Sequence, residues 1–250
     1  MGRCSHRLAV LGVAFVAAGC GGHGGPGYTR LHFRASDGVL LDGRLFGKGD
    51  EGVVLVHMGR PGDTQSDWAS VARVLAGKGL RVLTFDRRGI CPKHGAGCSK
   101  GFDSYEQSWR DVVGAVHFLR SKGVRKAVVV GASIGAMSSL YAVSEDKIRP
   151  AALIEFAGIN NASGYGFDRQ QIHRIPGLKV FLSARDDPYG GAQAARQWFH
   201  WASPPRRLAL VPGDDHGTDY LRAGNPQRRH VERLIAGFVE LALRPGPGRQ

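Results

Sequence analysis

The chain has 250 residues, of which 42% are hydrophobic and 22% are charged, and its formal net charge is +13 at pH 7. This apolar content is sufficient for a buried core, so a wholly disordered chain is excluded. A collagen-like chain is excluded because the 37 glycines do not recur at every third position. A polytopic membrane protein is excluded because no uninterrupted apolar run reaches the roughly 20 residues of a membrane-spanning helix. The positive charge permits nucleic-acid binding, but the charge indicates such binding only if the basic residues also cluster on one surface.

Residues 1–19 are predicted to be a signal peptide. They begin with the positive or ionisable side chains Arg3, His6 and Arg7. Residues 8–19 then form an apolar run without a charge, which is short for a membrane span and typical of the core of a signal peptide. The mature chain is therefore expected to leave the cytoplasm.

The residues that follow resemble a bacterial lipoprotein box. The small residues Ala17-Ala18-Gly19 precede Cys20, and a glycine-rich stretch comes after it. The resemblance implies cleavage before Cys20 and lipid attachment to this cysteine, with residues 20–27 as a tether. The lipid then anchors the protein to a membrane of the cell envelope. An ordinary secretory signal, with Cys20 incidental and the protein secreted, is the alternative.

Two further cysteines belong to the mature chain. Cys91 and Cys98 bracket a short loop, and an oxidising compartment favours a disulfide between them. Such a small ring restrains a loop more than it stabilises a fold, because closure entropy grows with loop length. A metal site that includes His94 is the alternative, but two cysteines and one histidine leave a tetrahedral site one ligand short.

Strand and helix patterns alternate through the rest of the chain. The segments on either side of a turn predict strands over residues 28–35 and 39–46, and largely apolar segments predict strands over residues 52–57, 80–85, 126–130, 151–156, 178–183 and 207–211. Apolar residues at helical spacing predict helices over residues 65–77, 104–123, 134–143, 191–201 and 226–243. The turn Ser36-Asp37-Gly38 makes the first two strands a hairpin.

This alternation predicts an α/β fold built on one mostly parallel sheet of about eight strands, with helices on both faces and the hairpin as its antiparallel edge. No internal repeat or linker divides the chain, so a single domain is expected over residues 28–243. Residues 244–250 are rich in proline and glycine and are predicted to be a disordered tail.

A candidate nucleophile follows the strand over residues 126–130. The strand runs into Gly131-Ala132-Ser133-Ile134-Gly135, and a helix follows directly. In this context the pattern Gly-x-Ser-x-Gly presents the serine on a sharp turn, where side chains at the two glycine positions would collide with the adjacent strand and helix. The free N–H groups at the start of the helix point toward a developing oxyanion. Ser133 is therefore predicted to be a nucleophile.

Candidates for an acid and a base follow the last two predicted strands. Asp186-Asp187-Pro188 comes shortly after the seventh strand, and His216 after the eighth. Together with Ser133 they give the order Ser, Asp, His, and the chain resembles an α/β-hydrolase over nearly all of residues 28–243.

The resemblance implies a role for each of these residues. Ser133 is the nucleophile, His216 the base and Asp187 the acid that orients the base. Asp187 is preferred because the acid of this family often directly precedes a proline, and Asp186 stays open as the alternative. The same aspartates also suit a helix cap followed by proline in the first turn, and the two interpretations are compatible.

The resemblance also implies an oxyanion hole built from two backbone N–H groups. One belongs to Ile134, the residue after the nucleophile, and the other to the loop after the third strand. The family usually has His-Gly in that loop, whereas this chain has His57-Met58. The second donor is therefore Met58 or Gly59, and Gly59 is preferred for its offset from His57. His57 itself is expected to be a structural hydrogen-bonding residue.

The sequence is less informative about the substrate. Asp86-Arg87-Arg88-Gly89 resembles the Asp-x-Arg-Gly turn of the family, which supports the fold beneath the site.

Residues 158–177 are too few for a helical cap domain, so a minimal cap or none is expected. Three apolar residues of this segment either line a shallow acyl site or pack in the core: Tyr165, Phe167 and Ile172.

These features predict a serine hydrolase that cleaves a carboxylic ester through an acyl-enzyme intermediate. A peptidase, thioesterase or acyltransferase on the same fold is the alternative, because the same three residues serve these reactions. A second alternative is a non-catalytic basic protein that binds an anionic envelope component. The basic residues are scattered and form no continuous stripe, so no nucleic-acid partner is expected. No metal-ligand or nucleotide-binding pattern occurs in the sequence, so a cofactor-free enzyme with a small ester or acyl substrate is expected.

Overall fold

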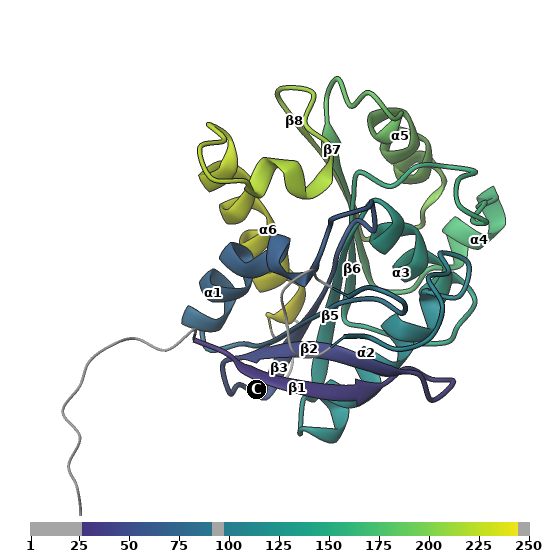
Figure 1. Cartoon of the computed structure of the whole chain (residues 1–250). Coiled ribbons are helices and arrows are strands. Elements are labelled where there is room, and N and C mark those ends of the chain that lie inside the picture. Colours follow the sequence, from purple (N-terminus) through teal and green to yellow (C-terminus); the bar gives the residue numbers. More distant parts are fainter. Residues whose placement is uncertain (1–26, 92–97, 245–250) are drawn as a thin grey trace, which may run out of the picture.

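Eight strands form one sheet at the centre of the molecule (Figure 1). The strands are β1 (Thr29–Arg34), β2 (Leu40–Phe46), β3 (Glu51–Val56), β4 (Arg81–Phe85), β5 (Lys126–Ala132), β6 (Ala152–Phe156), β7 (Leu178–Ala184) and β8 (Arg206–Val211). In the computed structural model, which describes residues 27–91 and 98–244, they lie in the order β1-β2-β4-β3-β5-β6-β7-β8. The β1–β2 and β2–β4 pairs are antiparallel and the other pairs are parallel. The prediction of a mostly parallel sheet with an antiparallel hairpin at its edge is confirmed.

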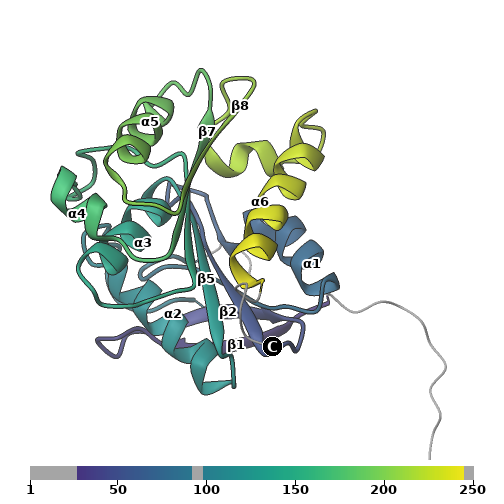
Figure 2. The same cartoon turned by 180° about the vertical axis from the view of Figure 1, so that it is seen from behind.

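Helices cover both faces of this sheet (Figures 1 and 2). One face carries α1 (Ala69–Gly77) and α6 (Arg228–Leu243), and the other carries α2 (Trp109–Ser121), α3 (Ile134–Ser144), α4 (Arg169–Arg174) and α5 (Gly191–Trp201). Successive strand residues point to opposite faces. Val54 therefore packs in the apolar cluster under α2 and α3, whereas its neighbour Val53 packs in the cluster under α1 and α6. Burial on both faces explains why central strands such as β3 and β5 are largely apolar, whereas the edge strand β1 is mostly exposed and polar.

The predicted helices differ from the observed ones mainly in their first turns. The helix predicted over residues 65–77 begins with the 3-10 helix η1 (Gln65–Trp68), which is capped by the side chain of Thr64. α2 begins at Trp109 rather than at residue 104. The N–H of Trp109 donates to the hydroxyl of Tyr165 (3.3 Å) instead of to the carbonyl one helical turn before it, so the preceding residues form turns.

Two short helices are not predicted by the sequence pattern. The helix α4 lies within the segment 158–177 and is capped reciprocally by Asp168 and Gln171. The 3-10 helix η2 (Gly217–Leu221) directly follows His216. Neither is long enough to show an apolar period, which is the signal that predicts helices.

Some expectations fall on residues that the structure does not describe. The predicted signal peptide over residues 1–19, Cys20 with residues 20–26 of the tether, His94, and residues 245–250 of the predicted tail lie outside the described residues. Cys91 and Cys98 are joined by a disulfide, the pairing expected from the sequence. Within residues 27–91 and 98–244, no helix is both long and apolar enough to cross a membrane.

The turn after β4 ties together elements that are distant in sequence. Asp86 accepts hydrogen bonds from the backbone N–H and the side-chain amide of Gln65 (2.7 and 2.8 Å). The guanidinium of Arg88 donates to Asp111 of α2 (2.7 Å) and to Asp37 of the first hairpin (2.9 Å). Because Arg88 and Asp111 are buried, the charge-assisted bond between them is shielded from water. The turn thus has the structural role that its resemblance implies.

The two edges of the sheet are formed by β1 and β8. Both edge strands carry arginines. Arg30 and Arg34 lie on β1, where both are exposed, and Arg206 and Arg207 open β8, where Arg207 is exposed.

The contact between α2 and β1 generates a stability prediction. A Cβ atom at Gly114 would lie 2.5 Å from the Cα of Ala35 and closer still to the carbonyl oxygen of Arg34. Gly114→Ala should therefore lower the free energy of unfolding by about 2 kcal/mol or more, because backbone has to move. Urea denaturation followed by circular dichroism measures the change.

Gly237→Ala is the matched control in α6. A Cβ atom at Gly237 meets nothing within 4 Å, so this variant should gain about 0.5–1 kcal/mol from the higher helix propensity of alanine. Equal effects of the two substitutions would show that α2 does not need the close approach at Gly114.

Candidate active site

Ser133 occupies the turn between β5 and α3. Its φ of 51° lies in the left-handed region, where residues other than glycine are uncommon. A Cβ atom at Gly135 would lie 2.5 Å from the carbonyl oxygens of Val56 and His57, and one at Gly131 would collide with the backbone of Gly135. Both glycine positions of the Gly-x-Ser-x-Gly pattern therefore have no room for a side chain, which is the physical reason for the motif.

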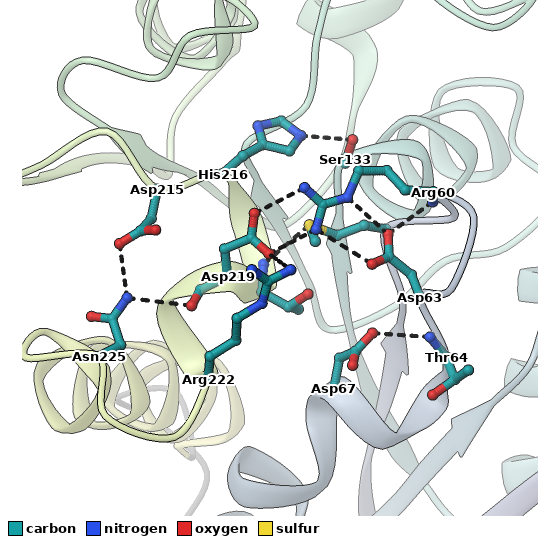
Figure 3. A network of polar contacts seen from close by, with 12 residues as sticks. Arg60, Asp63, Thr64, Asp67, Ser133, Asp215, His216, Asp219, Arg222 and Asn225 are labelled. Carbon is teal, nitrogen blue, oxygen red and sulfur yellow. Dashed lines mark hydrogen bonds and ion pairs between the residues drawn. The ribbon is translucent and has the colours of Figure 1, made fainter.

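The structure brings Ser133, His216 and Asp187 together in one hydrogen-bonded chain. Nε2 of His216 lies 2.8 Å from Oγ of Ser133, a contact drawn in Figure 3, and Nδ1 of His216 lies 2.9 Å from Oδ2 of Asp187. All three residues are buried. A carboxylate only accepts hydrogen bonds, so Nδ1 carries the proton of the imidazole and Nε2 is left to accept the serine hydroxyl. This arrangement prepares Ser133 to lose its proton to His216.

Asp187, and not Asp186, faces the imidazole. Asp186 is exposed and contacts the neighbouring loop through its backbone N–H. Oδ1 of Asp187 accepts the N–H of Tyr189 (2.9 Å). Burial alone would raise the pKa of Asp187, but the hydrogen bond and charge of His216, with backbone N–H donors, lower this pKa below its ordinary value. The N-cap residue of α5 is Gly190, which has no side chain, and the backbone N–H of Gly191 at the start of α5 is one of the donors that lower the pKa of Asp187.

The two N–H groups expected for the oxyanion hole are not both available. The N–H of Ile134 donates to the carbonyl oxygen of Met58 (3.2 Å). Gly59, the preferred second donor, has a φ of +90°. In this structure the Met58 carbonyl therefore occupies the side of Ile134 on which an oxyanion would be bound.

The side chain of Met58 links this loop to the loop of His216. It is buried, and its sulfur accepts the N–H of Thr218 (3.2 Å). A smaller residue at this position would lose the contact. Nε2 of His57 accepts the N–H of Arg87 (3.2 Å). Burial, together with the charge of Arg87, lowers the pKa of His57 to about 3, so His57 is a neutral structural acceptor at pH 7.

Arg60 forms a second bridge between the same two loops (Figure 3). Its guanidinium donates to Asp63 in its own loop (Nε to Oδ2, 3.1 Å) and to both carboxylate oxygens of Asp219 in η2 (2.9 and 2.7 Å). Asp219 also pairs with Arg222 (2.7 Å). Because two parallel hydrogen bonds join the guanidinium of Arg60 to the carboxylate of Asp219, they fix the orientation of the two groups as well as holding them together. Sequence reasoning missed this bridge because the partners lie in loops without periodicity, far apart along the chain.

A cavity of about 210 Å³ opens beside Ser133 and His216. Its walls are mostly apolar, with side chains of Pro61, Ile134 and Ile159. The other residues that line it are two tyrosines and three residues from the flanking loops: Tyr105, Tyr189, Gly59, Arg60 and Ser163.

The three apolar residues left open by the sequence belong to the core and not to this cavity. Tyr165, Phe167 and Ile172 are all buried in the cluster under α2, α3 and α5. The hydroxyl of Tyr165 donates to the carbonyl of Tyr105 (2.7 Å), and Phe167 packs edge-on against Trp198. They are packing residues that hold the segment 158–177 down on the domain.

Glu155 is a buried acid that the sequence analysis did not single out. It lies in β6, where one oxygen accepts the N–H of Gly158 and the other has no hydrogen-bond partner among the described residues. Burial, with the nearby charge of Asp187, raises the pKa of Glu155 to about 8. Glu155 is therefore mostly neutral at pH 7, and its ionisation would bring a second negative charge near Asp187. A charged residue inside the apolar run 152–156 was the available signal.

Across residues 27–91 and 98–244, no group of three or more His, Cys, Asp or Glu side chains is placed to hold a metal ion.

Comparisons with known proteins agree on the fold. A family model described as alpha/beta hydrolase fold matches residues 52–178. No curated protein sequence matches the chain. Among solved structures, the esterase Pf2001 of Pyrococcus furiosus is 14% identical with a TM-score of 0.67, covering 86% of this chain and 92% of that chain.

Two further solved structures resemble this chain to a similar degree. A monoacylglycerol lipase of Paleococcus ferrophilus is 14% identical with a TM-score of 0.64, covering 81% of this chain and 99% of that chain. A meta-cleavage product hydrolase of Pseudomonas fluorescens is 15% identical with a TM-score of 0.66, covering 85% of this chain and 98% of that chain. At these identities the likeness shows the fold.

The buried acid generates a pH prediction. In the unfolded chain Glu155 ionises near its ordinary pKa of 4.5, whereas in the folded chain its pKa is about 8. Folding between these values requires Glu155 to take up a proton, so the contribution of this group to stability falls as pH rises. Glu155→Gln removes that cost. Its advantage in unfolding free energy over the wild type should grow by up to about 1.4 kcal/mol per pH unit between pH 4.5 and 8.

Urea denaturation at pH 5, 7 and 8.5 measures this advantage. Glu106→Gln is the control, because Glu106 is exposed and its replacement should produce no gap that grows with pH. A constant difference between Glu155→Gln and the wild type across this range would show that Glu155 is ionised in the folded protein.

Proposed function

Because this chain belongs to the α/β-hydrolase fold family, we propose that it is a serine hydrolase that cleaves a carboxylic ester. Ser133 is the nucleophile, His216 the general base and Asp187 the acid that orients it. The observation that carries the proposal is the buried hydrogen-bonded chain from Oγ of Ser133 through His216 to Asp187, at 2.8 and 2.9 Å. A protein that only binds a ligand does not need a serine, a histidine and an aspartate joined in this sequence of hydrogen bonds.

The geometry supports a two-step reaction. Oγ of Ser133 attacks the ester carbonyl while Nε2 of His216 takes the serine proton, and the alcohol then leaves with that proton. Water attacks the resulting acyl-enzyme, giving its proton to His216, which returns it to Ser133 as the carboxylic acid is released. Asp187 keeps the imidazole in the required tautomer and stabilises its protonated form.

The cavity favours a small acyl group. A volume of about 210 Å³ with mostly apolar walls accommodates a short acyl chain, and the packed segment 158–177 leaves no cap domain to extend it. Peptides, thioesters and acyl acceptors other than water use the same chemistry, so they remain outcomes of the substrate test. We also keep export and lipid attachment at Cys20 as proposals that rest on the sequence pattern.

Replacement of the nucleophile tests the proposal directly. Ser133→Ala should lower the turnover of p-nitrophenyl acetate by roughly 10⁴-fold or more, and it should abolish covalent labelling by a fluorophosphonate probe. Ser144→Ala, at the far end of the helix α3 that follows Ser133, is the matched control, because its hydroxyl donates to the carbonyl of Tyr141. Wild-type activity in a folded Ser133→Ala variant would refute the proposal.

The size of the cavity predicts a chain-length preference. Among p-nitrophenyl esters, kcat/KM should rise from acetate to butyrate and then stay level to octanoate, because methylene groups beyond the cavity remain in water and add no binding. The same assay with matched thioesters and anilides compares the leaving groups. A preference for octanoate would show that the acyl chain binds elsewhere.

A further inference from the structure

The oxyanion hole is blocked by the protein's own backbone. A tetrahedral intermediate needs N–H donors aimed at its oxygen, and the N–H of Ile134 is the expected donor next to Ser133. In this structure that N–H is bonded to the Met58 carbonyl at 3.2 Å. The carbonyl carries partial negative charge, so it repels an oxyanion as well as displacing it. The site as it stands lacks its electrostatic component.

The missing second donor belongs to the same peptide unit as the blocking carbonyl. In a trans peptide the C=O and the following N–H point in opposite directions. Because the carbonyl of Met58 points at Ile134, the N–H of Gly59 points away from it, and this N–H has no hydrogen-bond partner among the described residues. The orientation of this one peptide unit thus makes the N–H groups of both Ile134 and Gly59 unavailable to an oxyanion.

The chain on both sides of this peptide unit is held in place. The carbonyl of Gly59 accepts hydrogen bonds from the guanidinium of Arg87 and from the hydroxyl of Tyr105, both at 3.1 Å. The buried side chain of Met58 is fixed by the N–H of Thr218 at 3.2 Å. A rotation of the plane between the two Cα atoms breaks none of these contacts and needs no net movement of the loop.

Backbone angles identify which residue permits the rotation. Turning a peptide plane by about half a turn changes ψ of the residue before it and φ of the residue after it. Gly59 has a φ of +90°, which glycine adopts without penalty and other residues rarely adopt. After the rotation φ becomes about −90°, which every residue type tolerates. The blocked state, and not the rotated one, is therefore what requires glycine at this position.

We propose that the Met58–Gly59 peptide plane is a switch that assembles the oxyanion hole when an acyl substrate binds. Rotation removes the Met58 carbonyl from the N–H of Ile134 and turns the N–H of Gly59 toward the same point. The substrate oxygen then accepts both hydrogen bonds. The inference rests on the proposed function, since it concerns the oxygen of a substrate attacked by Ser133.

Crystal structures of the free and the phosphonylated wild-type protein test the switch. Ethyl p-nitrophenyl methylphosphonate forms a bond between Oγ of Ser133 and phosphorus and releases p-nitrophenolate, and its phosphonyl oxygen takes the place of the oxyanion. The switch predicts that both N–H groups, of Ile134 and Gly59, bind this oxygen, with φ of Gly59 near −90°. A phosphonylated protein in which Met58 still accepts the N–H of Ile134 overturns the inference. Failure to label Ser133 overturns the proposed function itself.

A pair of glycine variants tests the same switch in solution. Alanine at position 59 penalises the blocked state through its positive φ, whereas its Cβ keeps the same neighbours in both states because the Cα atoms stay in place. Contacts of that Cβ at 3.1 Å from Arg87 and 3.3 Å from Ile134 therefore largely cancel between the two states. Gly59→Ala should react with the phosphonate about tenfold faster than the wild type.

Gly62→Ala is the matched control. Gly62 lies in the same loop with a φ of +92°, and its Cβ would meet nothing within 4 Å. This variant bears the same backbone penalty without touching the switch, so it should lose stability with no gain in rate. A folded Gly59→Ala protein that reacts no faster than the wild type overturns the inference. If Gly59→Ala does not fold, the crystal structures decide.

Discussion

The site depends on the close approach of the turn at Ser133 to its two neighbouring strands. Gly135 lies against the carbonyl oxygens at the end of β3, and the N–H of Ser133 donates to the carbonyl of Phe156 at the end of β6 (2.9 Å). These contacts fix the start of α3 from both sides, so the nucleophile is placed by backbone and not by a side chain. They also bring the loop after β3 within hydrogen-bond distance of Ile134, where a backbone carbonyl or a substrate oxygen competes for the same N–H.

Two side-chain bridges join the loop after β3 to the loop of His216. Met58 does so through the buried hydrogen bond that its sulfur accepts from the N–H of Thr218, and Arg60 does so through paired carboxylates that include Asp219. The two bridges differ in kind, since salt screens an ion pair but leaves a buried contact unaffected. Together they hold the loop after β3 against the segment that follows His216, so the rotation that we propose for the Met58–Gly59 peptide plane needs no movement of either segment. Stability of the loops and mobility of a single plane are therefore compatible.

The fold could be read from the sequence because burial on both faces of the sheet leaves a strong signal. All eight predicted strands lie within one or two residues of the observed ends, six of them from largely apolar segments and two from the turn that joins them, and Gly-x-Ser-x-Gly located Ser133. The choice between Asp186 and Asp187 needed the structure, since adjacent residues point in opposite directions and only the bend of the chain decides which one is buried. The bridge from Arg60 to Asp219 and the unpaired carboxyl of Glu155 depend on three-dimensional contacts that no local pattern encodes.

The arginines on β1 and β8 place part of the positive charge of the chain at the two edges of the sheet. A strand at the edge of a sheet offers unpaired backbone groups to any other strand, and an open sheet has two such edges. Here Arg34 on β1 and Arg207 on β8 are both exposed, so each edge presents positive charge where another strand would have to pair. Part of the surplus of basic residues that first raised the question of nucleic acid thus lies at the two open edges of the sheet.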